Sequence, residues 1–432
     1  MVIYYKNGDE FYNDNREIID NNLIENSFFK LNYPAIMGFE RNNFCIKIID
    51  NEKYLIALNR DPYNLLLFGD GSLCDKLAYE IYSHNLHING VLASEDLVNE
   101  FCKSYTKYSK FKFEDLFSMG LLVSNEVSDE SDAQKASIED IKLLQDYDKK
   151  FHIEIFNEEP KIEHEIIADN YYVYKYNNEI VSCAHKTREE ENICSISGVY
   201  TNPNYRGKGF ARKVVSTIRN EIVKSGKIAY LYVDNNNPIS SHLYKSIGFK
   251  LLVNRKEVKC IESNIRRVVF AGGCFWCIAG AFYSLDGVLE VYSGYCGGKK
   301  VNPSYNEVKS GTTGHMEAIM IEYDSDKVSY ENLLKTYFEN IDPFDGDGQF
   351  IDRGSSYQTA VFTNNESQKM IFTNIINDIQ NKYNKEVKVK LLDENVFNFA
   401  EEEHQKFAIK HPDKYKHEEE ISGRTKFNKI NI

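Results

Sequence analysis

The chain has 432 residues, of which 42% are hydrophobic and 27% are charged, so it can bury sizeable cores and is expected to form about two to four domains. This composition excludes a disordered or fibrous protein. The 52 basic and 65 acidic side chains give a net charge of −13, and residues 265–432 alone carry 20 basic and 25 acidic ones, so nucleic acid and anionic membranes are not expected partners.

The first part of the chain, residues 1–127, mixes helical and strand patterns but carries no motif that indicates a chemistry. Its residues 1–15 turn polar and acidic before an apolar signal-peptide core can form. No stretch of about 18 uncharged apolar residues occurs anywhere in the chain. We therefore expect a cytoplasmic protein without a membrane span.

Two changes in composition divide the chain. Residues 128–137 are small and polar, which is typical of a linker. Near Asn264 a charged, alternating run gives way to the buried-strand pattern of residues 268–271. We therefore expect domains at 1–127, 138–263 and 264–432.

The middle domain alternates helical and strand periods, which predicts a mixed α/β fold. The expected elements are a helix at 138–155, strands at 171–176, 180–186 and 193–200, a helix at 209–225, a strand at 229–233, a helix at 238–247 and a final strand.

A glycine-rich turn precedes the helix expected at 209–225. A turn of this kind at a helix N-terminus presents backbone N–H groups to a phosphate, although a Gly-x-Gly pair alone is weak evidence. Here the whole run RGKGFA at 206–211 follows a strand, and Asn237 and the run LYKSIGF at 243–249 come after it. With these motifs, residues 138–252 resemble the GNAT acetyltransferases.

The resemblance implies an acetyl-CoA-dependent N-acetyltransferase whose amine acceptor is unknown. The implied roles are carbonyl binding by the backbone of Val199 and Tyr200, proton donation to the leaving thiolate by Tyr244, pyrophosphate binding by Arg206, Gly207, Lys208, Gly209, Phe210 and Ala211, and a pantetheine contact by Asn237. Glu154 and His185 are candidates for the general base, and each also has a surface or packing explanation. The alternative is a non-catalytic module that binds acetyl-CoA or a client protein.

Residues 1–127 match the same fold only loosely, through residues 88–92 followed by a helix. They are either a degenerate GNAT-like copy that shapes the acceptor pocket or a separate regulatory or binding module.

The last domain, 264–432, has an α+β pattern. Strands are expected near 268–271, 288–294, 316–323, 358–362 and 387–391, and helices near 274–284, 329–339, 366–381 and 399–410.

The chain has nine cysteines at scattered positions, which is not a secreted disulfide framework. Only Cys274 and Cys277 have C-x-x-C spacing, and no second pair or nearby histidine pair completes a zinc site. They follow a strand and open a helix, where free backbone N–H groups and the helix dipole favour a thiolate. The pair indicates redox or nucleophilic chemistry, although a buried structural pair, or a reversible disulfide that senses redox state, would also fit the spacing alone.

Further motifs follow this thiol pair in order. They are NPSY at 302–305, GHMEA at 314–318 and QFIDRGSSY at 349–357, together with Gly294-Tyr295, Gly297-Gly298, Asp342-Pro343 and AEEEHQ at 400–405. With GCFWC at 273–277, this segment resembles peptide methionine sulfoxide reductase A. The resemblance implies a two-layer α+β domain related to the ferredoxin-like fold.

The implied chemistry is thiol-dependent reduction of methionine-S-sulfoxide, free or in proteins. The implied roles are nucleophile for Cys274, acid for Glu317, hydroxyl donors to the sulfoxide oxygen for Tyr305 and Tyr357, orientation of this network for Asp352, and an apolar wall for the methyl group from Phe275 and Trp276. Glu317 would need an apolar pocket to stay protonated near neutrality.

Reduction leaves a sulfenic acid on Cys274, which a second thiol must reduce. Many members of the family carry resolving cysteines near the C-terminus, but no cysteine follows Cys296 in this chain. Cys277 is the first candidate, Cys296 the second and an external thiol the third. A thioredoxin-like partner is the expected reductant, and no metal is expected.

Overall fold

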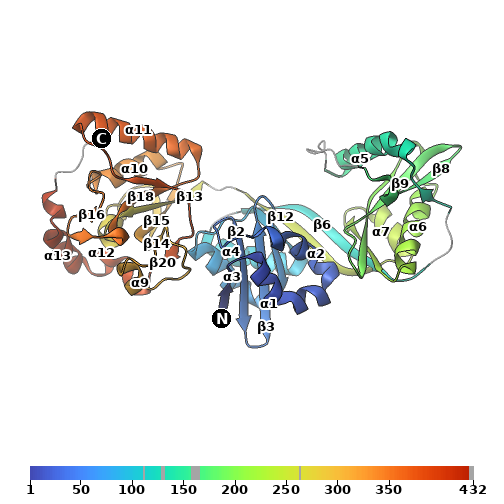
Figure 1. The fold of residues 1–432 in the computed structure, drawn as a ribbon, viewed down its shortest axis with the longest axis horizontal. Coiled ribbons are helices and arrows are strands. Elements are labelled where there is room, and N and C mark those ends of the chain that lie inside the picture. The colour runs from blue at the N-terminus through green and yellow to red at the C-terminus, as the bar shows by residue number, and fades with distance from the viewer. Residues whose placement is uncertain (110–111, 128–131, 157–165, 262–263, 428–432) are drawn as a thin grey trace.

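A computed structural model of the chain describes residues 1–109, 112–127, 132–156, 166–261 and 264–427. Three parts lie in a row, with the N-terminal part between the other two (Figure 1). The first two parts share one 12-stranded sheet, and the third has a six-stranded sheet and a two-stranded one. The molecule is therefore a multidomain α/β protein with mixed sheets, as the sequence predicts.

The N-terminal part contains six strands and four helices. They are β1 (Val2–Tyr4), α1 (Gly8–Asn21), α2 (Leu23–Asn32), β2 (Asn43–Asp50), β3 (Lys53–Arg60), β4 (Leu65–Gly69), α3 (Cys74–Ser83), β5 (Gly90–Ser94), α4 (Glu95–Ser109) and β6 (Lys112–Ser124).

The middle part repeats this order of elements, apart from α2. It consists of β7 (Gln134–Lys135), α5 (Ile141–Phe156), β8 (Tyr171–Tyr176), β9 (Glu179–Thr187), β10 (Ile193–Thr201), α6 (Phe210–Lys224), β11 (Ile228–Asp234), α7 (Pro238–Ser246) and β12 (Lys250–Ile261). In each copy three antiparallel strands lead to a helix and then to a strand parallel to the third one, β5 beside β4 and β11 beside β10.

The two copies exchange their last strands. The sheet runs β5-β12-β6-β11 at its centre, so β6 of the first copy pairs with β11 of the second, and β12 pairs with β5. The long strands β6 and β12 also pair with each other, with Met119 opposite Arg255 (Figure 1). The expected linker at 128–137, of which 128–131 lie outside the described residues, therefore joins segments that share one sheet.

The C-terminal part has the strand order β19-β18-β13-β15-β14-β20. Its elements are β13 (Ile265–Gly272), α8 (Phe275–Gly280), β14 (Val288–Cys296), α9 (Tyr305–Lys309), β15 (Met316–Asp324), α10 (Tyr330–Glu339), β16 (Gly348–Gln349), β17 (Asp352–Arg353), β18 (Thr359–Phe362), α11 (Glu366–Tyr383), β19 (Lys390–Leu392), β20 (Asn398–Phe399), α12 (Phe407–Lys410) and α13 (Pro412–Ser422). Helices α8, α10 and α11 pack on one face of the sheet and bury the main core, so this part is a two-layer α+β domain.

One expected helix is wrong. Residues 399–410 form the end of β20, a 3₁₀ turn over Glu402–His404 and the short α12, not a continuous helix. Phe399 pairs with Gly294 of β14, and Lys406 has a left-handed backbone with φ 57° that interrupts the helical path. The helix expected at 274–284 is also shorter, since α8 ends at Gly280.

The N-terminal part covers the second face of this sheet. The Tyr82 hydroxyl lies 2.8 Å from that of Tyr292 on β14 and donates to Glu322 on β15 at 3.1 Å. Arg267 stacks over the Tyr82 ring, and His84 bonds to Asn302 at 2.8 Å. These partly buried contacts join the two parts.

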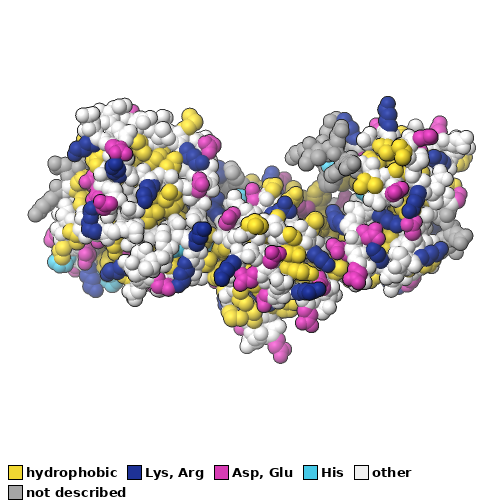
Figure 2. Space-filling model, in the orientation of Figure 1, with side chains coloured by type: hydrophobic (Ala, Val, Ile, Leu, Met, Phe, Trp, Pro, Cys, Tyr) yellow, Lys and Arg dark blue, Asp and Glu magenta, His cyan; other side chains and the backbone are white. Residues whose placement is uncertain are grey.

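The surface carries mixed charge. On the face in view in Figure 2, acidic and basic side chains are interspersed over all three parts. Among the helices of the described ranges, none is both long and apolar enough to cross a membrane.

Candidate active site

Cys274 lies where the central strand β13 meets α8. It is the N-cap residue of that helix rather than a member of its first turn, and its side chain is partly exposed. Gly273 before it has φ 77°, and a Cβ there would lie 2.6 Å from the Gln349 side chain and 2.9 Å from Nη2 of Arg424. Only glycine therefore lets the chain turn from strand to helix at this point.

Glu317 stands beside the thiol on β15, on the sheet face that α8 covers. It is 2% exposed, and its Oε2 accepts the Phe275 N–H at 3.1 Å. Burial raises the pKa of Glu317 well above its usual range, and the nearby Cys274 adds to this effect, while hydrogen bonds from Phe275 and Tyr357 oppose it. The carboxyl group therefore holds a proton at a pH where an exposed glutamate has lost it.

Two tyrosine hydroxyls complete the polar side of the site. Tyr305 begins α9, and its N–H donates to Glu401 at 2.8 Å, while Tyr357 ends a 3₁₀ turn over Ser355–Tyr357. Their hydroxyls share a hydrogen bond, and burial raises the pKa of Tyr305 to about 12 and that of Tyr357 as well. Both therefore stay neutral and can donate.

The apolar side consists of the predicted aromatic residues and one histidine. Trp276 stacks on Phe407 at 3.9 Å, and Phe275 is buried in the core. His404, to which the sequence assigned no role, lies 4.7 Å from the Tyr305 ring and 5.3 Å from that of Phe275. Burial lowers its pKa, so it is neutral. Its place in the AEEEHQ run was the only signal.

The second thiol lies one turn into the helix. Cys277 is 7% exposed, and its thiol shares a hydrogen bond with that of Cys274. This bond lowers the pKa of Cys277 and raises the pKa of Cys274, which burial raises further. Cys296 is fully buried on the opposite face of the sheet, in the cluster with Met316 and Ala318. Of the two candidate resolving thiols, Cys277 therefore lies next to Cys274, whereas the sheet separates Cys296 from it.

Asp352, on β17, lies at the rim of this site. Its carboxylate is 4.0 Å from Nη2 of Arg424, and burial raises its pKa while Arg424 opposes the rise. Within the described residues, no group of three or more His, Cys, Asp or Glu is arranged to hold a metal.

A second candidate site lies in the middle part, where β10 and β11 diverge. These strands pair only from residues 193–195 to 228–230. β10 then bulges between Ser197 and Tyr200, and Gly198 has φ 60°. A bulge turns backbone groups out of the ladder, here at Gly198 and Val199, and Tyr200 pairs again with Cys183 of β9.

The predicted glycine loop begins α6. Gly207 and Gly209 have φ values of 75° and 81°, and no atom lies within 4 Å of a Cβ at either position. Gly209 caps the helix without a side chain, so the first N–H groups of α6 are open to a ligand. Phe210 stacks on Tyr174 at 5.0 Å, so its side chain anchors the helix.

The other predicted residues of this site have local partners. Arg206 pairs with Glu154 at 2.6 Å, which holds the candidate base Glu154 beside the loop. Asn237 caps α7 by accepting the Ser240 N–H at 3.0 Å. Tyr244 is 6% exposed, and burial raises its pKa. Arg206, Asn237 and Tyr244 belong to the loop before α6 and to α7, whereas the thiol site lies at the other end of the molecule (Figure 1).

Comparison with known proteins identifies the C-terminal part. Residues 266–432 match the family model described as peptide methionine sulfoxide reductase. The peptide methionine sulfoxide reductase MsrA of Halalkalibacterium halodurans is 43% identical over 169 residues, which are 96% of that protein and 39% of this chain. The chain belongs to the peptide methionine sulfoxide reductase family. The MsrA of Listeria monocytogenes serotype 4a is 41% identical over 168 residues, 95% of that protein and 38% of this chain.

A second family model matches the chain before the reductase domain. Residues 177–258 match the family model described as FR47-like protein. A GNAT-family acetyltransferase structure from Colwellia psychrerythraea covers 60% of this chain and 98% of its own, with 10% identity and a TM-score of 0.38. The structure of methionine sulfoxide reductase A of Corynebacterium diphtheriae covers 35% of this chain and 77% of its own, with 24% identity and a TM-score of 0.33.

Proposed function

We propose that the reductase domain reduces the S epimer of methionine sulfoxide, free or in proteins, through Cys274. The Cys274 thiolate bonds to the sulfoxide sulfur, and Glu317 gives its proton to the sulfoxide oxygen. The hydroxyl group passes to the Cys274 sulfur as methionine leaves, so the products are a thioether and a cysteine sulfenic acid. The observation that carries this proposal is the burial of Glu317 at the head of α8, where its Oε2 accepts the Phe275 N–H and burial raises its pKa.

The thiol pair can supply the nucleophile itself. Because Cys274 and Cys277 share a hydrogen bond, movement of its proton to Cys277 leaves the thiolate on Cys274. The hydroxyls of Tyr305 and Tyr357 would hold the sulfoxide oxygen, and Phe275 and Trp276 would hold its methyl group.

The test is turnover of the separated S and R epimers of a methionine sulfoxide peptide by the full chain with dithiothreitol. We expect reduction of the S epimer alone. Reduction of neither epimer, or of both equally, would contradict the proposal.

For recycling, we infer that Cys277 attacks the sulfenic acid on Cys274, which forms a disulfide and releases water. A thioredoxin-like dithiol then reduces this disulfide. Cys277 is one helical turn from Cys274, whereas Cys296 lies across the sheet and burial raises its pKa.

Replacement of Cys277 by serine is expected to stop thioredoxin-driven turnover after a single reduction. The variant should release about one methionine per chain, since the resolving thiol is lost, and should do so more slowly than the wild type, since Cys277 also accepts the Cys274 proton. The measurement is methionine release without reductant, followed by peptide mapping of the oxidised wild type. A disulfide between Cys274 and Cys296, or no disulfide, would show that Cys277 is not the resolving thiol. Cys102→Ser serves as the matched control.

We further propose that the middle part binds acetyl-CoA and transfers its acetyl group to an amine. The open N–H groups of α6 would bind the pyrophosphate, the bulge near Val199 and Tyr200 would hold the thioester carbonyl, and Tyr244 would protonate the leaving thiolate. A module that binds acetyl-CoA without transfer is the alternative. Release of free CoA with a panel of primary amines, amino acids and lysine peptides separates the two.

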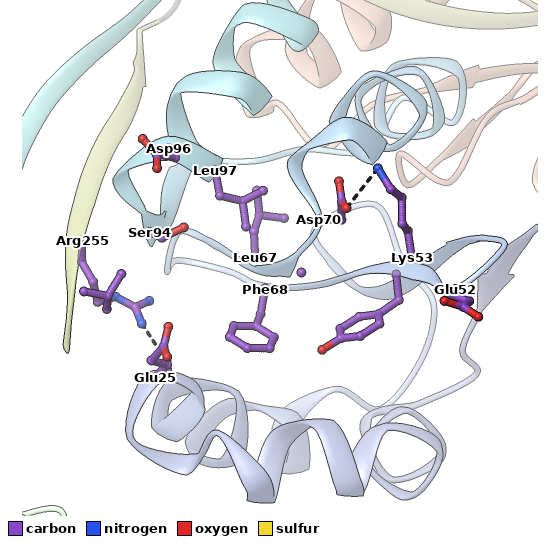
Figure 3. A pocket seen from close by; sticks show the side chains of 13 residues that line it. Glu25, Glu52, Lys53, Leu67, Phe68, Asp70, Ser94, Asp96, Leu97 and Arg255 are labelled. Atoms are coloured by element: carbon purple, nitrogen blue, oxygen red, sulfur yellow. Dashed lines mark hydrogen bonds and ion pairs between the residues drawn. The ribbon is translucent and has the colours of Figure 1, made fainter.

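The N-terminal part is proposed to be a degenerate copy without a phosphate site. Its cleft between β4 and β5 contains a cavity of about 570 Å³ (Figure 3). In the loop after β4, however, the Asp70 carboxylate accepts the Ser72 N–H at 2.9 Å and pairs with Lys53 at 3.3 Å. This carboxylate occupies the place that a phosphate would need.

One acetyl-CoA per chain is therefore expected by titration calorimetry. Replacement of Gly209 by valine should weaken binding at least about 10-fold, because valine strains a backbone with φ 81° and would extend into the open space in front of the helix. Sulfoxide reduction should not change. Binding of two acetyl-CoA molecules by the wild type, or unchanged acetyl-CoA affinity in Gly209→Val, would contradict the assignment. Gly226→Val is the control, because it replaces a glycine at the far end of α6.

A further inference from the structure

The C-terminal tail of the chain returns to the thiol site. Helix α13 packs on α8, and a Cβ on Gly280 would collide with the Tyr415 hydroxyl. The helix ends at Gly423, whose φ of 81° turns the chain sharply, and Arg424 opens a 3₁₀ turn. This turn carries Arg424 back toward β13 and α8.

Arg424 is buried at the site without full compensation of its charge. Its side chain is 8% exposed and stacks over the Phe350 ring at 4.4 Å. Nη1 donates to the Asn340 carbonyl at 3.5 Å, and Asp352 is 4.0 Å from Nη2, too far for a hydrogen bond. Within the described residues, Nε and Nη2 have no hydrogen-bond partner.

A buried guanidinium with unused donors is costly unless an anion compensates it. Asp352 supplies part of this compensation. Another acidic group nearby is the Cys277 thiol, on the helix that α13 packs against. The hydrogen bond with Cys274 lowers the pKa of Cys277 most and the charge of Arg424 lowers it further, whereas burial, Asp352 and Glu419 oppose these effects.

We propose that Arg424 is the positioning residue of the resolving step, which it promotes by stabilising Cys277 as a thiolate once Cys274 has become a sulfenic acid. This inference rests on the proposed resolving role of Cys277. At that stage Cys274 no longer donates its thiol proton to Cys277, so the hydrogen bond that stabilised the anion is lost and the Arg424 charge takes its place. The tail of this chain thus contributes a cation, not a thiol, to recycling.

The step balances without another reactant. The Cys277 sulfur bonds to the Cys274 sulfur, the S–O bond breaks, and the oxygen leaves as hydroxide, which takes a proton from solvent to become water. Cys277 supplies the electron pair and is oxidised, and the sulfenic sulfur is reduced to the disulfide level.

The experiment separates methionine release from disulfide formation. Reduced full-length chain is mixed with excess methionine-S-sulfoxide peptide without reductant, and samples are quenched with an alkylating agent. Methionine per chain reports the first step, and mass spectrometry of the Cys274–Cys277 peptide reports the second.

Arg424→Met should slow disulfide formation at pH 7 at least about 10-fold, the loss of thiolate that accompanies a pKa rise of about one unit. The rate should recover as pH rises, and methionine release should change less than about 3-fold. Arg424→Lys should retain most of the rate, because it keeps the charge. Arg353→Met is the control, since Arg353 is exposed and pairs with Asp345.

Three outcomes would overturn the proposal: an unchanged disulfide rate in Arg424→Met, a rate that does not recover at high pH, or an equal slowing of both steps. If Arg424→Met does not fold, Arg424→Gln replaces it, with the pH profile as the readout. If Cys277 is not the resolving thiol, the wild type itself will form no Cys274–Cys277 disulfide. That result is distinct from the three outcomes above.

Discussion

Replacement of Cys274 by serine is expected to lower sulfoxide reduction at least about 1,000-fold, to the background of the assay. A serine hydroxyl is a much weaker nucleophile than a thiolate at neutral pH. Acetyl-CoA binding should persist, since the proposed cleft at β10 and β11 lies at the other end of the molecule (Figure 1). Methionine released from the S epimer with dithiothreitol measures the first effect, and calorimetry the second.

The control for this variant is Cys260→Ser, which removes another partly buried thiol far from the site and should keep full activity. Turnover in Cys274→Ser would mean that the nucleophile is assigned to the wrong residue. Loss of acetyl-CoA binding together with activity would mean that the two ends of the molecule depend on each other.

The second large effect is expected for Glu317→Gln, which should lower kcat about 100-fold or more, because glutamine cannot give a proton to the sulfoxide oxygen. Burial raises the pKa of Glu317, so the active, protonated form is present below that pKa and is lost as pH rises through it. The wild-type rate should therefore fall on the alkaline side, and this fall should be absent from the residual activity of the variant.

Stability gives the matching control. Because the pKa of Glu317 is raised, the folded state favours the protonated carboxyl group. The protonated group adds fully to the free energy of unfolding below the pKa that Glu317 has in the unfolded chain. This stabilisation is lost as pH rises through the pKa that Glu317 has in the folded chain. Glutamine is neutral at every pH, so Glu317→Gln should leave the melting temperature almost unchanged. At high pH the variant should melt no lower than the wild type. A large loss of stability, or an equal loss of rate in the exposed Glu331→Gln, would indicate a structural cause.

The residues of the proposed reductase site can be predicted from motifs alone. Cys274, Glu317, Tyr305 and Tyr357 were each named from short runs in a fixed order, and the structure brings all four together around the head of α8. The glycine loop before α6 was found in the same way. Such motifs are readable because backbone geometry restricts which residues can occupy these positions.

Residues that act through long-range packing left no such signal. His404 and Arg424 stand in polar, charged segments whose patterns suggest exposed surface, yet both are buried against α8 or its neighbours. The expected helix at 399–410 failed for the same reason. Pairing of Phe399 with β14 and the contacts of Glu401 with Tyr295 and Tyr305 outweigh its helical periodicity.

The sequence by itself determined the family of the C-terminal part and the order of its longer helices and strands, because these depend on local periodicity and on motifs of contiguous residues. Only the tertiary structure decided that β6 and β12 exchange between the two N-terminal copies, that Cys296 lies across the sheet from Cys274, and that the C-terminal turn brings Arg424 within 4.0 Å of Asp352 at the rim of the site. Each of these depends on contacts between residues far apart in the chain, which local patterns do not encode.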